Sequence, residues 1–182
     1  MILRWHLTGK FRYCLYLCGF IFWHFHSGQL GYLLAARRGK DMFYRFVATD
    51  LTIHFICFIC FILIPTTNIR PEIPGNTLSE KILALVYSLD GGNSPSNLFP
   101  SIHCYVSWMC WKGVEGSEKV PKWYQRFSLV FAILIIISTQ VLKQHYIVDA
   151  AAALLLVEFF WRFYQKGQRH KWVVHVFAHK KK

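Results

Sequence analysis

Acidic residues are scarce in this chain, with 9 Asp and Glu against 21 Lys and Arg, and the formal net charge is +12. Charged residues of both signs make up only 16% of the sequence, whereas hydrophobic residues reach 54% and aromatic residues 18%. Ordinary soluble domains carry roughly 25% charged residues. Together with the mean hydropathy of +0.30, this composition argues against a soluble domain and favours a membrane protein.

A continuous basic face is also missing, which argues against a nucleic-acid partner despite the high net charge. Nucleic-acid binding requires basic residues gathered on one surface of a soluble fold. Here they stand in three blocks, each beside an apolar segment, as membrane topology requires. The blocks are Arg37, Arg38, Lys40 and Arg45; Lys112, Lys119, Lys122 and Arg126; and Arg162, Lys166, Arg169, Lys171 and the three lysines at 180–182.

The sequence lacks a zinc-binding pattern, although Cys57 and Cys60 form a C-x-x-C. No second pair of ligands follows, and the surrounding residues are apolar, so thiolates there would be poorly solvated. The six cysteines all lie within apolar runs and are expected to be small buried hydrophobic residues. We therefore expect no metal.

Five apolar segments are candidates for membrane-spanning helices, since a span needs roughly 20 mostly apolar residues. The two short ones are flanked by interfacial aromatic residues. A secretory signal is rejected for the first, because it is too long and arginines follow it instead of a cleavage site. The sequence therefore predicts an all-α integral membrane bundle with spans at 13–36, 46–65, 101–114, 127–142 and 147–164.

Alternation of five spans places the three basic blocks on one membrane face, which carries 15 Lys and Arg against 6 on the other. The positive-inside rule makes the richer face cytoplasmic, with the C-terminus. The predicted organisation is an N-terminal span and basic loop (1–45), a catalytic bundle (46–164) and a basic cytoplasmic tail (165–182).

The loop before residue 100 contains one predicted helix. Thr77 and Glu80 form a capping box, and an apolar stripe follows at Ile82, Leu83, Leu85, Val86 and Leu89. These features predict an amphipathic helix at the membrane interface. It would either roof a lipid headgroup site or cover the bundle.

Two histidines in polar motifs lie at the edges of apolar segments on the extracytoplasmic face. His145 precedes Asp149 by four residues, so on a helical turn they would share a face and the carboxylate would orient the imidazole. His103 follows Ser101, a predicted helix cap whose neighbouring amides attract phosphate. The alternative is structural, namely a satisfied polar pair and a simple N-cap.

Two cations fall on the same predicted face. Arg70 lies in a predicted extended segment bounded by prolines. Its guanidinium could bind two phosphate oxygens, or it could anchor the chain among lipid headgroups. Lys143 could add positive charge, or could snorkel to the interface. An imidazole nucleophile, an acid and such cations can together move a phosphoryl group.

These residues resemble the three ordered motifs of the type 2 phosphatidic acid phosphatase superfamily, Lys-x6-Arg-Pro, Pro-Ser-x-His and Ser-Arg-x5-His-x3-Asp. The matching segments are Arg70-Pro71, residues 100–103 and residues 138–149. The resemblance implies a helical bundle in which His145 forms a phosphohistidine, Asp149 orients it and His103 is the general acid. Ser101 and Arg70 would bind phosphate, without metal or cofactor.

Departures from the motifs leave open whether the chain hydrolyses its substrate, transfers a headgroup or lacks activity. Leu63 and Thr139 replace the first-motif lysine and the third-motif arginine, and the His-Tyr-x-x-Asp pattern is similar to the inositol phosphorylceramide synthase and sphingomyelin synthase branch. We expect a lipid phosphatase acting on a phosphomonoester or diphosphate. The alternatives are a phospho-headgroup transferase and a non-catalytic relative, because each lost oxyanion donor costs roughly 3 kcal/mol.

Overall fold

The computed structural model describes residues 31–67, 72–73, 76–89, 97–142 and 144–178, so most of the first predicted span lies outside it. Over these residues the regular elements are helices, and the predicted all-helical class is confirmed. The elements are α2 (Gly31–Arg38), α3 (Lys40–Leu63), α4 (Leu78–Leu89), α5 (Ile102–Val114), α6 (Lys122–Val141), α7 (Ile147–Gln165), the 3-10 helix η2 (Lys166–Lys171) and α8 (Trp172–Ala178).

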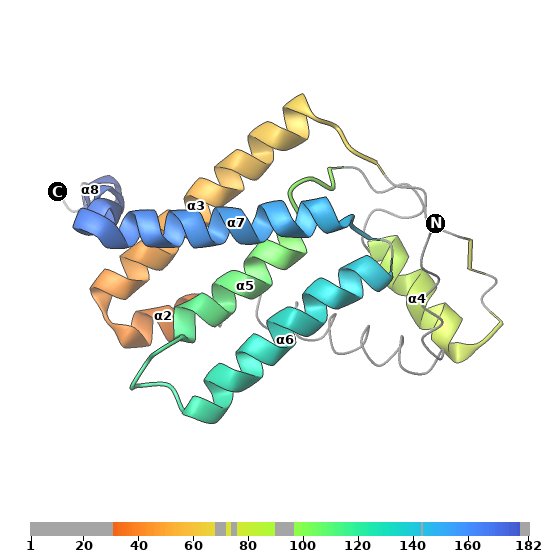
Figure 1. Ribbon diagram of the computed structural model, residues 1–182, viewed down its shortest axis with the longest axis horizontal. Coiled ribbons are helices and arrows are strands. Elements are labelled where there is room, and N and C mark those ends of the chain that lie inside the picture. The colour runs from red at the N-terminus through yellow and green to blue at the C-terminus, as the bar shows by residue number, and fades with distance from the viewer. Residues whose placement is uncertain (1–30, 68–71, 74–75, 90–96, 143, 179–182) are drawn as a thin grey trace.

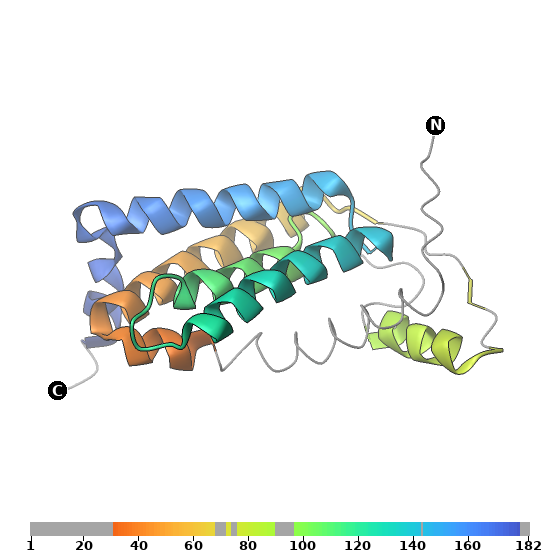
Figure 2. The same cartoon turned by 60° about the horizontal axis from the view of Figure 1, so that its bottom comes forward.

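Helices α3, α5, α6 and α7 form the main bundle (Figure 1). Helix α5 packs against both α6 and α7, while α7 also packs against α3. Their shared interior is apolar, and its fully buried side chains include Ile53, Tyr105, Met109 and Val157. Figure 2 shows α7 along one side of the bundle and α4 set apart beyond the end of α6.

The two histidine motifs lie at the same end of the bundle because of the directions in which the helices run. Helices α5 and α7 both begin there, and α6 ends there, as Figure 1 shows. The opposite end holds α2, the end of α5 and the end of α7, and therefore most basic residues. The separation of histidines from basic blocks thus follows from antiparallel packing of consecutive helices.

Two helices, α3 and α6, are long and apolar enough to cross a membrane by length and composition. Both begin earlier than predicted, α3 at Lys40 instead of 46 and α6 at Lys122 instead of 127. Gly39, with φ 129°, separates α3 from α2 in a conformation that favours glycine. Pro121 is the N-cap residue of α6. The fourth span was therefore predicted too short, because a search for runs of apolar residues does not include the polar residues that open the helix.

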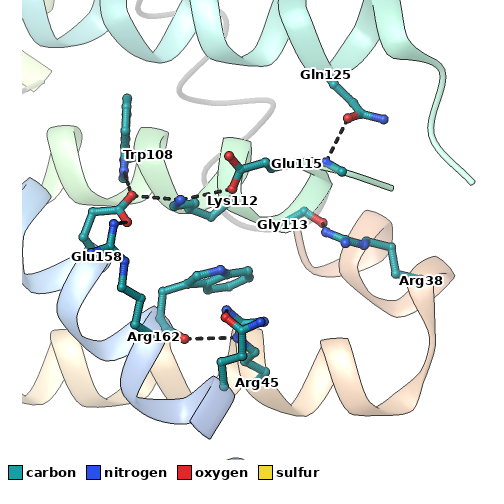
Figure 3. Close-up of polar contacts among 12 residues, drawn as sticks. Arg38, Arg45, Trp108, Lys112, Gly113, Glu115, Gln125, Glu158 and Arg162 are labelled. Carbon is teal, nitrogen blue, oxygen red and sulfur yellow. Dashed lines mark hydrogen bonds and ion pairs between the residues drawn. The ribbon is translucent and has the colours of Figure 1, made fainter. Parts of the chain in front are cut away.

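Two cations that the sequence analysis assigned to basic blocks on the cytoplasmic face are buried within helices. The Arg45 Nε donates to the carbonyl of Trp161 at 3.1 Å, and its guanidinium carbon lies 4.2 Å from the centre of the Trp161 ring. Lys112 contacts Glu115 at 3.0 Å and Glu158 at 2.9 Å (Figure 3). These cations hold helices together, and only the remaining basic residues are available to a membrane surface.

The predicted helix before the second motif is confirmed as α4. Its capping box is present, since the Glu80 amide donates to Thr77 Oγ1 at 3.2 Å and the Thr77 amide donates to Glu80 Oε2 at 3.1 Å. The buried Tyr87 hydroxyl donates to the carbonyl of Leu142 at 2.9 Å, which ties α4 to the end of α6. The position of α4 at a membrane interface stays a prediction.

Candidate active site

The start of α5 fixes the position of His103. Ser101 is fully buried, and its Oγ accepts a hydrogen bond from the Cys104 amide at 3.3 Å, which confirms the predicted N-cap. The cap places His103 in the first turn of α5. The Ser101 amide also donates to the carbonyl of Asp149 at 3.2 Å, so the two motifs are joined through their backbones.

The turn between α6 and α7 fixes the position of His145. One backbone carbonyl, that of Thr139, accepts from the amides of Gln144 at 2.9 Å and His145 at 3.2 Å. On the other side of the turn, Asp149 Oδ2 accepts from the amide of Tyr146, the N-cap residue of α7, at 2.8 Å. His145 is therefore held between the last turn of one helix and the first turn of the next.

The predicted reason for the pairing of His145 and Asp149 was wrong, although the pairing occurs. His145 precedes the N-cap of α7, so the two residues do not share a helical face. The carboxylate instead folds back over the N-cap as part of a capping box. This brings Asp149 Oδ2 to 3.6 Å from His145 Nδ1, with both side chains largely buried.

The two imidazoles meet, as the sequence predicts. His103 Nδ1 lies 3.3 Å from His145 Nε2, the ring centres are 5.5 Å apart, and the rings are inclined at 60°. A hydrogen bond at this distance requires a proton on one of the two nitrogens. His145 is 7% exposed, whereas His103 is half-buried, so His103 is the more accessible ring.

Asp149, His145 and His103 thus form a chain of three side chains from the interior outward. Because Nδ1 of His145 faces the carboxylate, Nε2 is the nitrogen directed away from it, toward His103. A carboxylate behind an imidazole fixes its tautomer and stabilises positive charge on it. Such an imidazole can act as a nucleophile, and a neighbouring imidazole can act as an acid or base.

The other residues that the sequence points to are two predicted phosphate-binding cations and two replaced motif positions. Arg70 and Lys143 lie outside the described residues. Thr139, at the position of the family's arginine, is 2% exposed, and its hydroxyl donates to the carbonyl of Ile136 at 2.9 Å. Leu63, at the position of the family's lysine, is 71% exposed at the end of α3. No group of three or more His, Cys, Asp or Glu with metal-ligand geometry occurs within the part described.

Two contributors to the site escaped sequence reasoning, the Thr139 carbonyl and the Tyr87 hydroxyl. The carbonyl shapes the His145 turn, and Tyr87 holds the carbonyl of Leu142 just before that turn. A backbone acceptor leaves no signature in the identity of its residue. An aromatic residue on an apolar stripe is indistinguishable from packing residues.

A second polar cluster lies between α3 and α5. The Tyr105 hydroxyl is 2.6 Å from His54 Nδ1, Asp50 Oδ2 is 3.4 Å from the same nitrogen, and the Tyr32 hydroxyl donates to Asp50. The neighbouring helix α5 therefore supplies a hydrogen-bond partner for the His54 ring.

Comparison with known families decides the assignment of the chain. The model of the PAP2 superfamily matches residues 21–162, a range that contains both histidine motifs, the helices α3, α5 and α6, and most of α7. The chain belongs to the PAP2 superfamily. Members of the PAP2 superfamily are generally phosphatases, so membership indicates phosphatase-type activity on phosphate esters. Neither the curated proteins nor the solved structures that were compared contain a match to the chain.

Proposed function

We propose that the chain is a multi-pass membrane lipid phosphatase that hydrolyses a lipid phosphomonoester or diphosphate through a phosphohistidine at His145. The observation that carries the proposal is the 3.3 Å contact between His103 and His145 in a PAP2 superfamily chain. Five spans would place this pair at the extracytoplasmic face and the C-terminus in the cytoplasm. The bundle at 46–164 would be the catalytic unit.

In the first step, His145 Nε2 attacks phosphorus. The nitrogen lone pair forms the N–P bond, the P–O ester bond breaks, and His103 gives a proton to the leaving oxygen. In the second step water attacks phosphorus, His103 takes up the water proton, and the N–P bond electrons return to His145. Asp149 would hold the other ring nitrogen throughout, and Arg70, Ser101 and Lys143 would bind the phosphate oxygens. The scheme uses no metal.

The distance between the rings is too short for this reaction without a movement of one ring. An attacking nitrogen stands about 3 to 3.5 Å from phosphorus, and the acid stands roughly 3 Å from the leaving oxygen. The two nitrogens must therefore separate from 3.3 Å to roughly 6 Å or more. His103 is the more exposed ring and lies in the first turn of α5, so it is the ring that would move.

Transfer of a phospho-headgroup is the second candidate, favoured by the replacement of two of the three motif cations, at Leu63 and Thr139, and by the His-Tyr-x-x-Asp pattern. The first step is the same. An acceptor alcohol then takes the place of water, and the outcome depends on which nucleophile reaches phosphorus. A non-catalytic relative would retain the fold and lose both steps.

One assay separates these functions. The purified protein in detergent is incubated with phosphatidic acid, phosphatidylglycerophosphate or an isoprenyl diphosphate, with and without inositol. The His145→Ala variant is measured alongside, and His175→Ala, which removes an exposed imidazole from α8, is the matched control. Release of inorganic phosphate by the wild type and by His175→Ala, but not by His145→Ala, supports the phosphatase. A new inositol lipid supports the transferase, and equal signals from wild type and His145→Ala contradict both.

A further inference from the structure

A groove runs along α7 and into η2 at the end of the bundle opposite the histidine pair. Its volume is about 540 Å³. One half is lined by the apolar side chains of Leu155, Phe159 and Phe163, and the other by the cations Arg162, Lys166 and Arg169. Glu158 lines it as well.

The apolar and cationic halves follow one another along a single helical stripe. Leu155, Phe159 and Arg162 are spaced by four and three residues, which places them on one face of α7, and Lys166 follows as the C-cap residue of the helix. The ten residue steps from Leu155 to the end of α7 at Gln165 span roughly 15 Å at 1.5 Å per residue. Half of a bilayer's hydrocarbon core is about 15 Å thick. The stripe thus matches one leaflet, with its charges at the headgroup level.

The apolar half of the groove is largely uncovered by the described part of the chain. Leu155 is 71% exposed and Phe159 is 60% exposed. The rings of Phe159 and Phe163 are nearly parallel, inclined at 19° with centres 6.1 Å apart. They present a flat apolar surface of the kind that acyl chains cover.

The charge of the groove is positive because its acidic residue is engaged by the bundle. Glu158 accepts from Trp108 Nε1 at 2.9 Å and pairs with Lys112 at 2.9 Å (Figure 3). Arg162 also reaches Glu158 at 3.3 Å, but its side chain is 74% exposed. Within the described part of the chain, Lys166 and Arg169 form no ion pair, and the Arg169 guanidinium carbon lies 4.5 Å from the centre of the Phe163 ring.

We propose that this groove binds one anionic phospholipid of the membrane, with its phosphate among Arg162, Lys166 and Arg169 and an acyl chain along Leu155, Phe159 and Phe163. Charge complementarity selects an anionic headgroup, and the exposed apolar half selects a lipid over a soluble anion. The site depends on the membrane embedding proposed above. It is independent of hydrolysis, since it lies at the other end of the bundle.

Native mass spectrometry of the full chain in detergent, titrated with phosphatidylglycerol or phosphatidylcholine, tests the proposal. Phosphatidylglycerol is a phosphodiester and therefore not a substrate of the proposed phosphatase. The test variant is Lys166→Gln/Arg169→Gln. The control is Lys122→Gln/Arg126→Gln, which removes two exposed cations from the start of α6.

The wild type and the control should retain phosphatidylglycerol in preference to phosphatidylcholine. The test variant should bind phosphatidylglycerol about thirtyfold more weakly, because each cation near an anionic group contributes roughly fivefold. Lys166→Gln alone should cost about fivefold, and circular dichroism should show that each variant keeps its helices. Inorganic phosphate, or soluble glycerol phosphate, should not displace the lipid.

Three results would overturn the proposal. One is equal binding of the two lipids by the wild type. Another is an equal loss in the test and control variants, which would indicate general attraction to a basic surface. The third is displacement of the lipid by inorganic phosphate, which would indicate a site for a soluble anion.

Discussion

The Nδ1 atom of His103 lies 3.3 Å from the Nε2 atom of His145, although 42 residues separate the two in the chain. The contact depends on backbone hydrogen bonds that place both rings, above all the bond from the Ser101 amide to the Asp149 carbonyl. An imidazole pair at the common end of three helices is the geometry on which the proposed two-step phosphoryl transfer depends.

The role of His103 as an acid predicts a dependence on the leaving group. His103→Gln should lower the rate on an alkyl phosphate such as phosphatidic acid by about 10² to 10⁴-fold, because the departing alkoxide then lacks its proton donor. The loss should be much smaller for a nitrophenyl phosphate, whose leaving oxygen needs little protonation. Rates of phosphate release from both substrates check this. An equal loss on both would assign His103 to substrate binding or structure.

The carboxylate of Asp149 caps α7 and, in the proposed mechanism, orients His145, and one substitution separates these two roles. In Asp149→Asn the amide oxygen can still accept from the Tyr146 amide, so the cap and the melting temperature should change little. Orientation of His145 should be lost, and kcat should fall by about 10² to 10⁴-fold. Phosphate release and thermal unfolding are measured together. A variant with normal kcat would remove Asp149 from the mechanism, and Asp149→Ala should lose both properties.

Tyr87 is expected to position the turn that carries His145. Tyr87→Phe leaves the Leu142 carbonyl without that hydroxyl, which costs about 1 to 3 kcal/mol locally. Amide hydrogen exchange over residues 144–150 should accelerate. Ser88→Ala is the control, because Ser88 Oγ donates only within α4, to the carbonyl of Leu85. Unchanged exchange in Tyr87→Phe would show that α4 does not support the turn.

The buried pair at the other end of the bundle should matter for stability. Lys112→Met leaves Glu158 without its buried cation, whose side chain is 10% exposed, and ~3 kcal/mol of stability should be lost. Arg162→Gln removes an exposed contact with the same carboxylate and should cost less than about 0.5 kcal/mol. Thermal unfolding in detergent compares them. Similar melting temperatures for the two variants would contradict this ranking.

The bundle helices, α4 and the site end of the fold could be predicted from the sequence, because apolar runs and the Thr77–Glu80 capping box are local signals. Helices η2 and α8 were not, because they fall in the segment expected to be only a basic tail. The first residues of α3 and α6 could not be predicted, because these helices begin with the polar residues Lys40 and Lys122. The burial of Arg45 against Trp161 was also missed. A buried cation is recognisable only when its distant acceptor is known.

Parts of the candidate site could also be predicted from the sequence, and other parts could not. The pairing of His103 with His145 follows from motifs assigned to one membrane face, whereas the reason for the contact between His145 and Asp149 does not. The spacing of four suggested a shared helical face, and the structure shows a turn folded back over an N-cap. Tertiary hydrogen bonds to Thr139 shape that turn, and they carry no local signal.

Trapping of the covalent intermediate tests the central claim most directly. The purified protein is mixed with phosphatidic acid labelled in its phosphate, quenched in alkali, which preserves phosphohistidine, and digested for mass spectrometry. We predict a phosphate on His145 in the wild type, and none on any residue in His145→Ala. Substrate turnover without a label on His145, or a label that persists in His145→Ala, would contradict the account.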